Sequence, residues 1–188
     1  QAARLKHWKN SLPSGTSPRP LRQSRKIRLI RHGQAEPSRF GQTDFARPLD
    51  QRGLDDLHNT AAQLVARKEN TADWLWSSSA ARTLATAQAL SSTCNCPMQL
   101  EEDLYLAGPE TILGVLQSTP EDFHNIILVG HNPGISMLAG LLSNPSLTIE
   151  LATLGIIELT FDGQWQHLNF GQCQLQSTYY YKTGVAKE

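Results

Sequence analysis

The sequence predicts a single α/β domain with a largely parallel sheet, because apolar segments of strand length alternate with segments of helical periodicity. The expected strands are Ile27–Arg31, Trp74–Trp76 and Ile126–Val129. Helices are expected over about 50–68, 79–90 and 109–117, with Ser77 to Ser79 as a cap and Pro133 opening another helix. Strands that alternate with helices form parallel sheets covered by helices.

The C-terminal part of the chain predicts a β-hairpin. Segments 155–161 and 164–170 flank Asp162-Gly163, a strong two-residue turn signal. We therefore expect a folded domain over 26–172 that ends in this hairpin. A disordered basic extension over 1–25 and a C-terminal tail over 173–188 are expected on either side.

Length and composition limit the classes of protein. The chain has 188 residues and a mass of 20.8 kDa, enough for one substantial core without disulfides or a structural metal. No run of about 18 apolar residues is present, so a membrane-spanning helix is not expected. Three cysteines are an odd and small number, which favours a reducing compartment over a disulfide scaffold.

Charge is distributed unevenly along the chain. Residues 1–31 hold nine of the 17 Lys and Arg and no acid, which leaves eight basic and 17 acidic residues for the remainder. Such an acidic body argues against nucleic-acid binding. The extension has no amphipathic face, so stable membrane association is not expected either. A cytoplasmic location is expected, or an organelle stroma or matrix if the basic, acid-free extension is a transit peptide.

Two loops carry the candidate chemistry. Arg31-His32-Gly33 follows the first strand, and Gly130-His131-Asn132 follows the buried strand at 126–129. Ligands bind beyond the carboxyl ends of parallel strands, and Arg82 opens a helix at a third such end. Two arginines and two histidines at one sheet edge suit a phosphoryl group, because guanidinium binds phosphate oxygens and imidazole can attack phosphorus. The His and Cys spacing matches no zinc pattern, so neither a metal nor another cofactor is expected.

At these motifs the sequence resembles the histidine phosphatase superfamily, which includes phosphoglycerate mutases and SixA-type phosphohistidine phosphatases. The matching stretches are 29–33, 77–87 and 129–134, and the likeness runs from about Ile27 to Phe170. Within the superfamily the sequence is most similar to the short SixA type. Segment 44–53 resembles that type, and the chain has little room for the large insertions of mutases and acid phosphatases. The resemblance implies a three-layer α/β/α sandwich and a metal-independent phosphatase.

The resemblance also implies roles for individual residues. His32 would be the nucleophile that forms a phosphohistidine intermediate. The phosphoryl group would be held by Arg31, Arg82, His131 and Gly33. Glu102 would donate a proton to the leaving group, with Glu101 and Asp103 as adjacent alternatives.

Departures from the family pattern bear on the substrate. Ala35 and Ser38 stand where mutases have Ser and Asn, and Asn132 stands where acid phosphatases place an acidic proton donor. This favours the SixA type and a phosphohistidine on a protein as substrate. A small phosphoester or sugar phosphate, and a non-catalytic module that docks phosphoproteins, are the alternatives.

Overall fold

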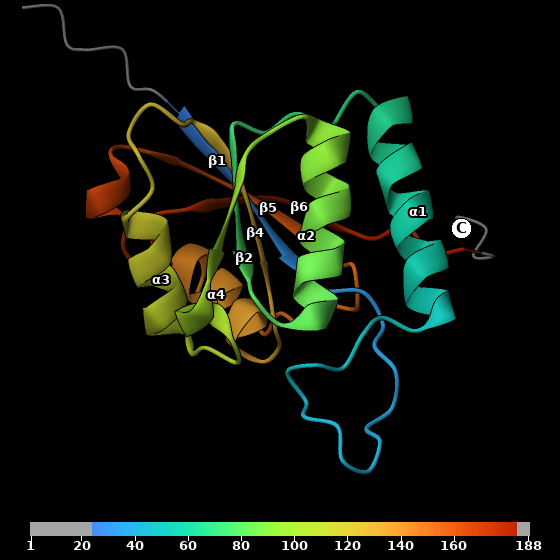
Figure 1. Cartoon of the computed structure of the whole chain (residues 1–188). Helices are drawn as coiled ribbons and strands as arrows, with labels where there is room; N and C mark the ends of the chain where they lie inside the picture. Colours follow the sequence, from blue (N-terminus) through green and yellow to red (C-terminus); the bar gives the residue numbers. More distant parts are fainter. Residues whose placement is uncertain (1–23, 184–188) are drawn as a thin grey trace, which may run out of the picture.

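A six-stranded sheet forms the centre of the fold in the computed structural model, which describes residues 24–183 (Figure 1). In chain order the strands are β1 (Ser24–Arg31), β2 (Trp74–Ser78), β3 (Met98–Glu101), β4 (Asn125–Gly130), β5 (Ile156–Asp162) and β6 (Gln174–Tyr179). The helices are α1 (Gln51–Ala66), α2 (Ala81–Cys94), α3 (Pro109–Gln117) and α4 (Gly134–Ser143), with short 3₁₀ helices η1 (Glu102–Leu104) and η2 (Trp165–His167).

The sheet order is β3-β2-β4-β1-β5-β6. Strands β3, β2, β4 and β1 are parallel, whereas β5 runs antiparallel to both of its neighbours, β1 and β6. Helices α1 and α2 cover one face and α3 and α4 the other (Figure 1). The predicted α/β sandwich with a mostly parallel sheet is therefore confirmed.

Both faces of the central strands are buried, and this explains their continuous apolar sequences. Leu29 and Leu128 point into the core that contains α3 and α4, whereas Ile30 and Val129 point into the core that contains α1 and α2. Side chains alternate between the faces of a strand, so apolar residues are favoured at both sets of positions. Arg28 of β1 is a buried exception, and its guanidinium donates to the Glu69 carbonyl (2.7 Å).

The predicted hairpin is wrong in its second strand. Residues 165–167 form η2 instead, and the fully buried Trp165 packs edge-to-face on Phe161 and donates a hydrogen bond to the Phe123 carbonyl (2.7 Å). The strand that pairs with β5 is β6, which lies within the predicted tail. The domain consequently extends beyond residue 172.

Two further expectations need correction. Ser77 and Ser78 are the last residues of β2 rather than a helix cap, and α2 begins after Ala80 with no side-chain cap. The extension predicted over 1–25 lies outside the described residues up to 23, but Arg25 belongs to β1. Its buried side chain donates to the Gly163 and Phe123 carbonyls (2.6 Å each). Within residues 24–183 no helix combines the length and the apolar character needed to cross a bilayer.

The start of α4 makes a close backbone contact that only glycine permits. A Cβ at Gly134 would lie 1.8 Å from the Ala107 carbonyl oxygen. We predict that Gly134→Ala lowers the free energy of unfolding by about 1–3 kcal/mol or more, because backbone must move to accept the methyl group. Urea unfolding measures the change.

Gly114→Ala in α3 is the matched control, because within residues 24–183 no atom outside the helix's own backbone lies within 4 Å of the added Cβ. This variant should be neutral or more stable by up to about 1 kcal/mol, since alanine favours helix. Equal stability of the two variants would contradict the proposed contact.

Candidate active site

Three parallel strands end at one edge of the sheet, and each end contributes to the candidate site. Arg31 of β1 pairs with Gly130 of β4, and the His32 amide donates to the Gly130 carbonyl (3.2 Å). This register places the His32 and His131 rings 5.2 Å apart. Strand β2 ends at Ser78, whose hydroxyl lies 2.8 Å from Nε2 of His131.

The imidazole of His32 is held in one tautomer. Its Nδ1 lies 2.6 Å from the Gly33 carbonyl oxygen, which can only accept, so Nδ1 carries the proton. Nε2 therefore carries the lone pair of the ring, and it accepts a long hydrogen bond of 3.3 Å from Nε of Arg82. Burial is the main cause that lowers the pKa of His32 to about 4; Arg82, Arg31 and Arg47 also lower it, and the Gly33 bond raises it. His32 is consequently neutral at physiological pH.

Arg82 is a buried guanidinium in the first turn of α2. Its NH1 donates to the main-chain carbonyl of Asp44 (2.7 Å) and its NH2 to Oδ2 of the same residue (2.9 Å). Tyr105 donates to that Oδ2 as well (2.7 Å), and Arg47 donates to Oδ1 (3.1 Å). The Tyr105 bond and the two arginines lower the pKa of Asp44 to about 2, against partial burial. One carboxylate thus positions two arginines.

His131 lies beside His32 and is also neutral. Burial is the main cause that lowers its pKa to about 3, followed by electrostatic interactions with His32 and with Arg82. Tyr105 packs edge-on against its ring, with centroids 5.5 Å apart. Nδ1 of His131 has no hydrogen-bond partner within residues 24–183, although it is buried.

Arg31 and Arg47 complete the positive charge of the site. NH1 of Arg31 donates to the Leu151 carbonyl (2.9 Å), and its buried Nε lacks a partner within the described chain. Burial lowers the pKa of Arg31, with Glu150 opposing. NH1 of Arg47 donates to the Glu36 carbonyl (3.1 Å), which fixes the loop that carries it.

These side chains surround an open cavity of about 470 Å³. Its lining includes four residues that the sequence singled out: Arg31, His32, Arg82 and His131. Gly33 does not line it, and its amide donates to the Thr86 hydroxyl (3.2 Å). Glu102 does not line it either and lies exposed on η1. Asn132 is at the cavity, but its amide group bonds to Leu151 and Ser136.

Sequence reasoning missed Asp44, Arg47 and Tyr105 as site residues. Asp44 and Arg47 lie in the connection between β1 and α1, which has no periodicity, and Tyr105 follows the acidic triplet in which a proton donor was sought. The sequence offered one signal for Asp44 and Arg47: both lie in segment 44–53, which resembles the SixA type.

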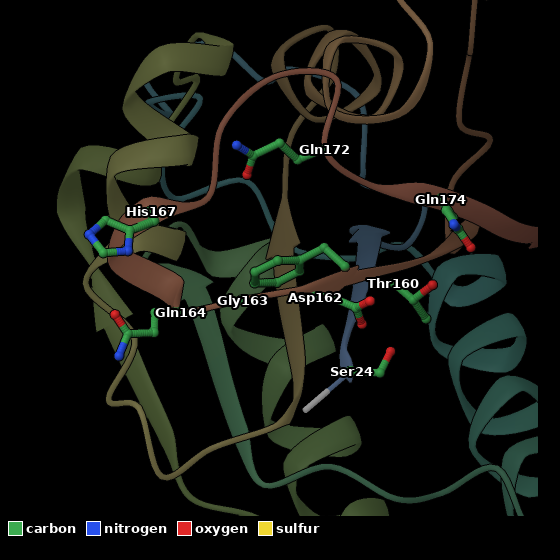
Figure 2. A pocket seen from close by; sticks show the side chains of 9 residues that line it. Ser24, Thr160, Asp162, Gly163, Gln164, His167, Gln172 and Gln174 are labelled. Carbon is green, nitrogen blue, oxygen red and sulfur yellow. The ribbon is translucent and has the colours of Figure 1, made fainter. Parts of the chain in front are cut away.

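A second polar cavity of about 450 Å³ lies at the opposite end of β1 (Figure 2). Ser24, Thr160, Asp162, His167 and several glutamines line it, and no Lys or Arg is among its described residues. It lacks the positive charge that a phosphoryl group requires. No cluster of three or more His, Cys, Asp or Glu within residues 24–183 is placed to hold a metal ion.

Comparison with known proteins agrees with this geometry. The sequence pattern of the histidine phosphatase superfamily (branch 1) matches residues 27–105, which include His32, Arg82 and Asp44. The matched segment and the shared fold relate the chain to the histidine phosphatase superfamily.

Two solved structures of the SixA type share the histidine phosphatase fold of this chain. A proposed phosphohistidine phosphatase SixA from Nakamurella multipartita is 24% identical, with a TM-score of 0.72 over 84% of this chain and 96% of its own. Its counterpart from Agrobacterium tumefaciens is 25% identical, with a TM-score of 0.68 over 82% of this chain and 97% of its own.

A curated relative, an uncharacterized protein of Mycobacterium leprae, is 27% identical over 92 residues, which are 45% of this chain and 57% of that protein. The match thus spans little more than half the length of this relative.

Removal of Arg82 tests the site as an anion-binding pocket. We predict that Arg82→Ala weakens binding of inorganic phosphate about ten- to hundredfold, because charge-assisted hydrogen bonds contribute about 1.5–3 kcal/mol. Calorimetry at low ionic strength measures the affinity. Arg52→Ala on α1, whose side chain is 62% exposed, is the control and should bind phosphate like the wild type. Equal affinities of the two variants would remove Arg82 from the anion site.

The lowered pKa of His32 predicts a pH dependence. An unfolded chain protonates imidazole near pH 6.5, so between pH 6.5 and about 4 it binds more protons than the folded protein. The stability contributed by this group is therefore present above pH 6.5 and is lost as pH falls through about 4. An NMR titration should place the His32 midpoint near 4, and His32→Asn should weaken the loss of stability on acidification. A His32 midpoint near 6.5 would contradict this.

Proposed function

We propose that this protein is a metal-independent phosphatase that forms a phosphohistidine on His32 and acts on phosphohistidine carried by a protein. The observation that carries the proposal is the state of His32. It is a neutral imidazole with Nδ1 bonded to a carbonyl, and it lines a cavity with three arginines. A nucleophile in this state needs no general base.

In the first step the lone pair of His32 Nε2 forms a bond to phosphorus. The bond from phosphorus to the leaving nitrogen breaks, and its electron pair stays on the leaving imidazole. Breaking the hydrogen bond from Arg82 to Nε2 costs little free energy, because at 3.3 Å this bond is long and therefore weak. The ring becomes positive, and the Gly33 carbonyl opposite Nδ1–H stabilises that charge.

The surrounding side chains stabilise the transferring group. Arg31, Arg82 and His131 are placed to bind the oxygens on which charge collects in the transition state. In the second step water attacks phosphorus, the Nε2–phosphorus bond breaks with its electrons returning to Nε2, and the water proton leaves with phosphate. The arginines supply the positive charge, so the proposal includes no metal.

The protonation states of the side chains that line the cavity favour phosphohistidine over an alkyl phosphoester as the substrate. An alkoxide leaving group needs a proton donor, yet near neutral pH Asp44 is ionised and His32 and His131 are neutral. The Asp44 bond raises the pKa of Tyr105 and retains its proton. An imidazole leaves as a neutral molecule when its second nitrogen already carries a proton. The role of Glu102 as donor stays a prediction that no contact with the cavity supports.

Phosphate release from a phosphohistidine-bearing protein in excess EDTA tests the proposal. The wild type and His58→Ala, which removes an exposed histidine of α1, should release phosphate. His32→Ala should release none while keeping its fold, because it lacks the attacking nitrogen.

Other outcomes would redirect the assignment. Turnover of small phosphoesters alone would favour the phosphoester alternative. Phosphate binding without turnover of any substrate would favour a docking module. Loss of wild-type activity in EDTA would overturn metal independence.

A further inference from the structure

Three exposed apolar side chains lie on the two segments that border the catalytic cavity. Phe40 is fully exposed (110%), Leu106 is 56% exposed and Phe45 is 41% exposed. Single exposed apolar residues are ordinary on protein surfaces. Their placement on segments that contribute to one cavity requires an explanation.

The connection between β1 and α1 presents Phe40 in a defined way. Its base is closed by the bridge between Ala35 and Leu49 and by the bond from the Glu36 amide to the Pro48 carbonyl (2.9 Å). The connection projects from the carboxyl edge of the sheet (Figure 1). Gly41, with φ of +79°, makes the turn directly after Phe40. The phenyl ring is therefore held in solvent by an anchored loop.

The other two side chains lie closer to the reacting groups than the loop tip does in the contacts they make. Phe45 packs edge-to-face on Tyr105, with centroids 5.1 Å apart, and Tyr105 packs in turn on His131. Leu106 follows Tyr105 and lines the cavity itself. Ring contacts thus lead from His131 through Tyr105 to the exposed Phe45, and Leu106 lies in the cavity wall.

We propose that Phe40, Phe45 and Leu106 form a docking rim for the folded protein domain that carries the phosphorylated side chain. The inference rests on the proposed function and specifies its substrate. A small phosphorylated molecule fills the cavity between the arginines and leaves Phe40 in water. Only a macromolecule whose phosphohistidine enters the cavity covers the loop tip, and covering a phenyl ring favours binding. The partner therefore has an apolar surface around its phosphorylated histidine.

Two substrates of different size separate docking from chemistry. We would measure kcat and KM for phosphoimidazole and for a histidine-containing phosphocarrier protein phosphorylated with phosphoramidate. Phe40→Ser should raise KM for the protein about tenfold, from the area of one aromatic side chain, and leave phosphoimidazole kinetics unchanged. Val65→Ser is the matched control, because Val65 is 53% exposed on the last turn of α1, and it should change neither.

The outcomes distinguish the two proposals. If the wild type hydrolyses both substrates and Phe40→Ser leaves both unchanged, the docking rim is wrong and the proposed function stands. An equal loss on both substrates would also overturn docking, because the loop would then act on the chemistry. If the wild type hydrolyses neither substrate, the proposed function fails and the rim fails with it.

Discussion

The parallel pairing of β1 with β4 at the centre of the sheet determines where every other part of the site lies. The register that sets Arg31 opposite Gly130 puts two histidines one residue beyond adjacent strand ends, with their rings 5.2 Å apart. Apolar side chains above and below the sheet fix this register, because a slip of one residue would exchange the faces of a strand buried on both sides. Packing of the core is thus the origin of the geometry of the candidate site.

Buried positive charge is the second constraint on the site. Arg82 is 2% exposed, and an unpaired guanidinium at such depth would be strongly destabilising. Asp44 meets this need with both its carboxylate and its main-chain carbonyl. The same burial and the same arginines keep His32 and His131 neutral. One arrangement therefore pairs the buried charge in the folded state, attracts a phosphoryl group and leaves the proposed nucleophile its lone pair.

The extent to which the sequence predicts this site follows from where its residues lie. Each of these four residues lies at or shortly after the end of a strand that an apolar sequence reveals, so their convergence could be inferred: Arg31, His32, Arg82 and His131. Asp44 contacts Arg82 across 38 positions from a connection without periodicity, and no local pattern records such a contact. The acidic triplet that includes Glu102 gave no direction for its side chains, and the structure leaves Glu102 exposed.

The C-terminal strand shows the same limit. Asp162-Gly163 does end β5, but burial of Trp165 draws the chain into η2, and the mostly exposed edge strand β6 carries no alternating pattern.

The connection between β1 and α1 links recognition to chemistry in the proposed function. Asp44 and Arg47 enter the cavity from this connection, and Phe40 stands at its tip. Its two ends pair with each other through the bridge between Ala35 and Leu49. Asp44 also accepts hydrogen bonds from Arg82 of α2 and from Tyr105. Because these bonds fix the tip relative to the cavity, a partner that contacts Phe40 would be oriented with respect to His32 before any bond is made. Orientation of this kind lowers the barrier to transfer, so an anchored loop serves a protein substrate better than a mobile one.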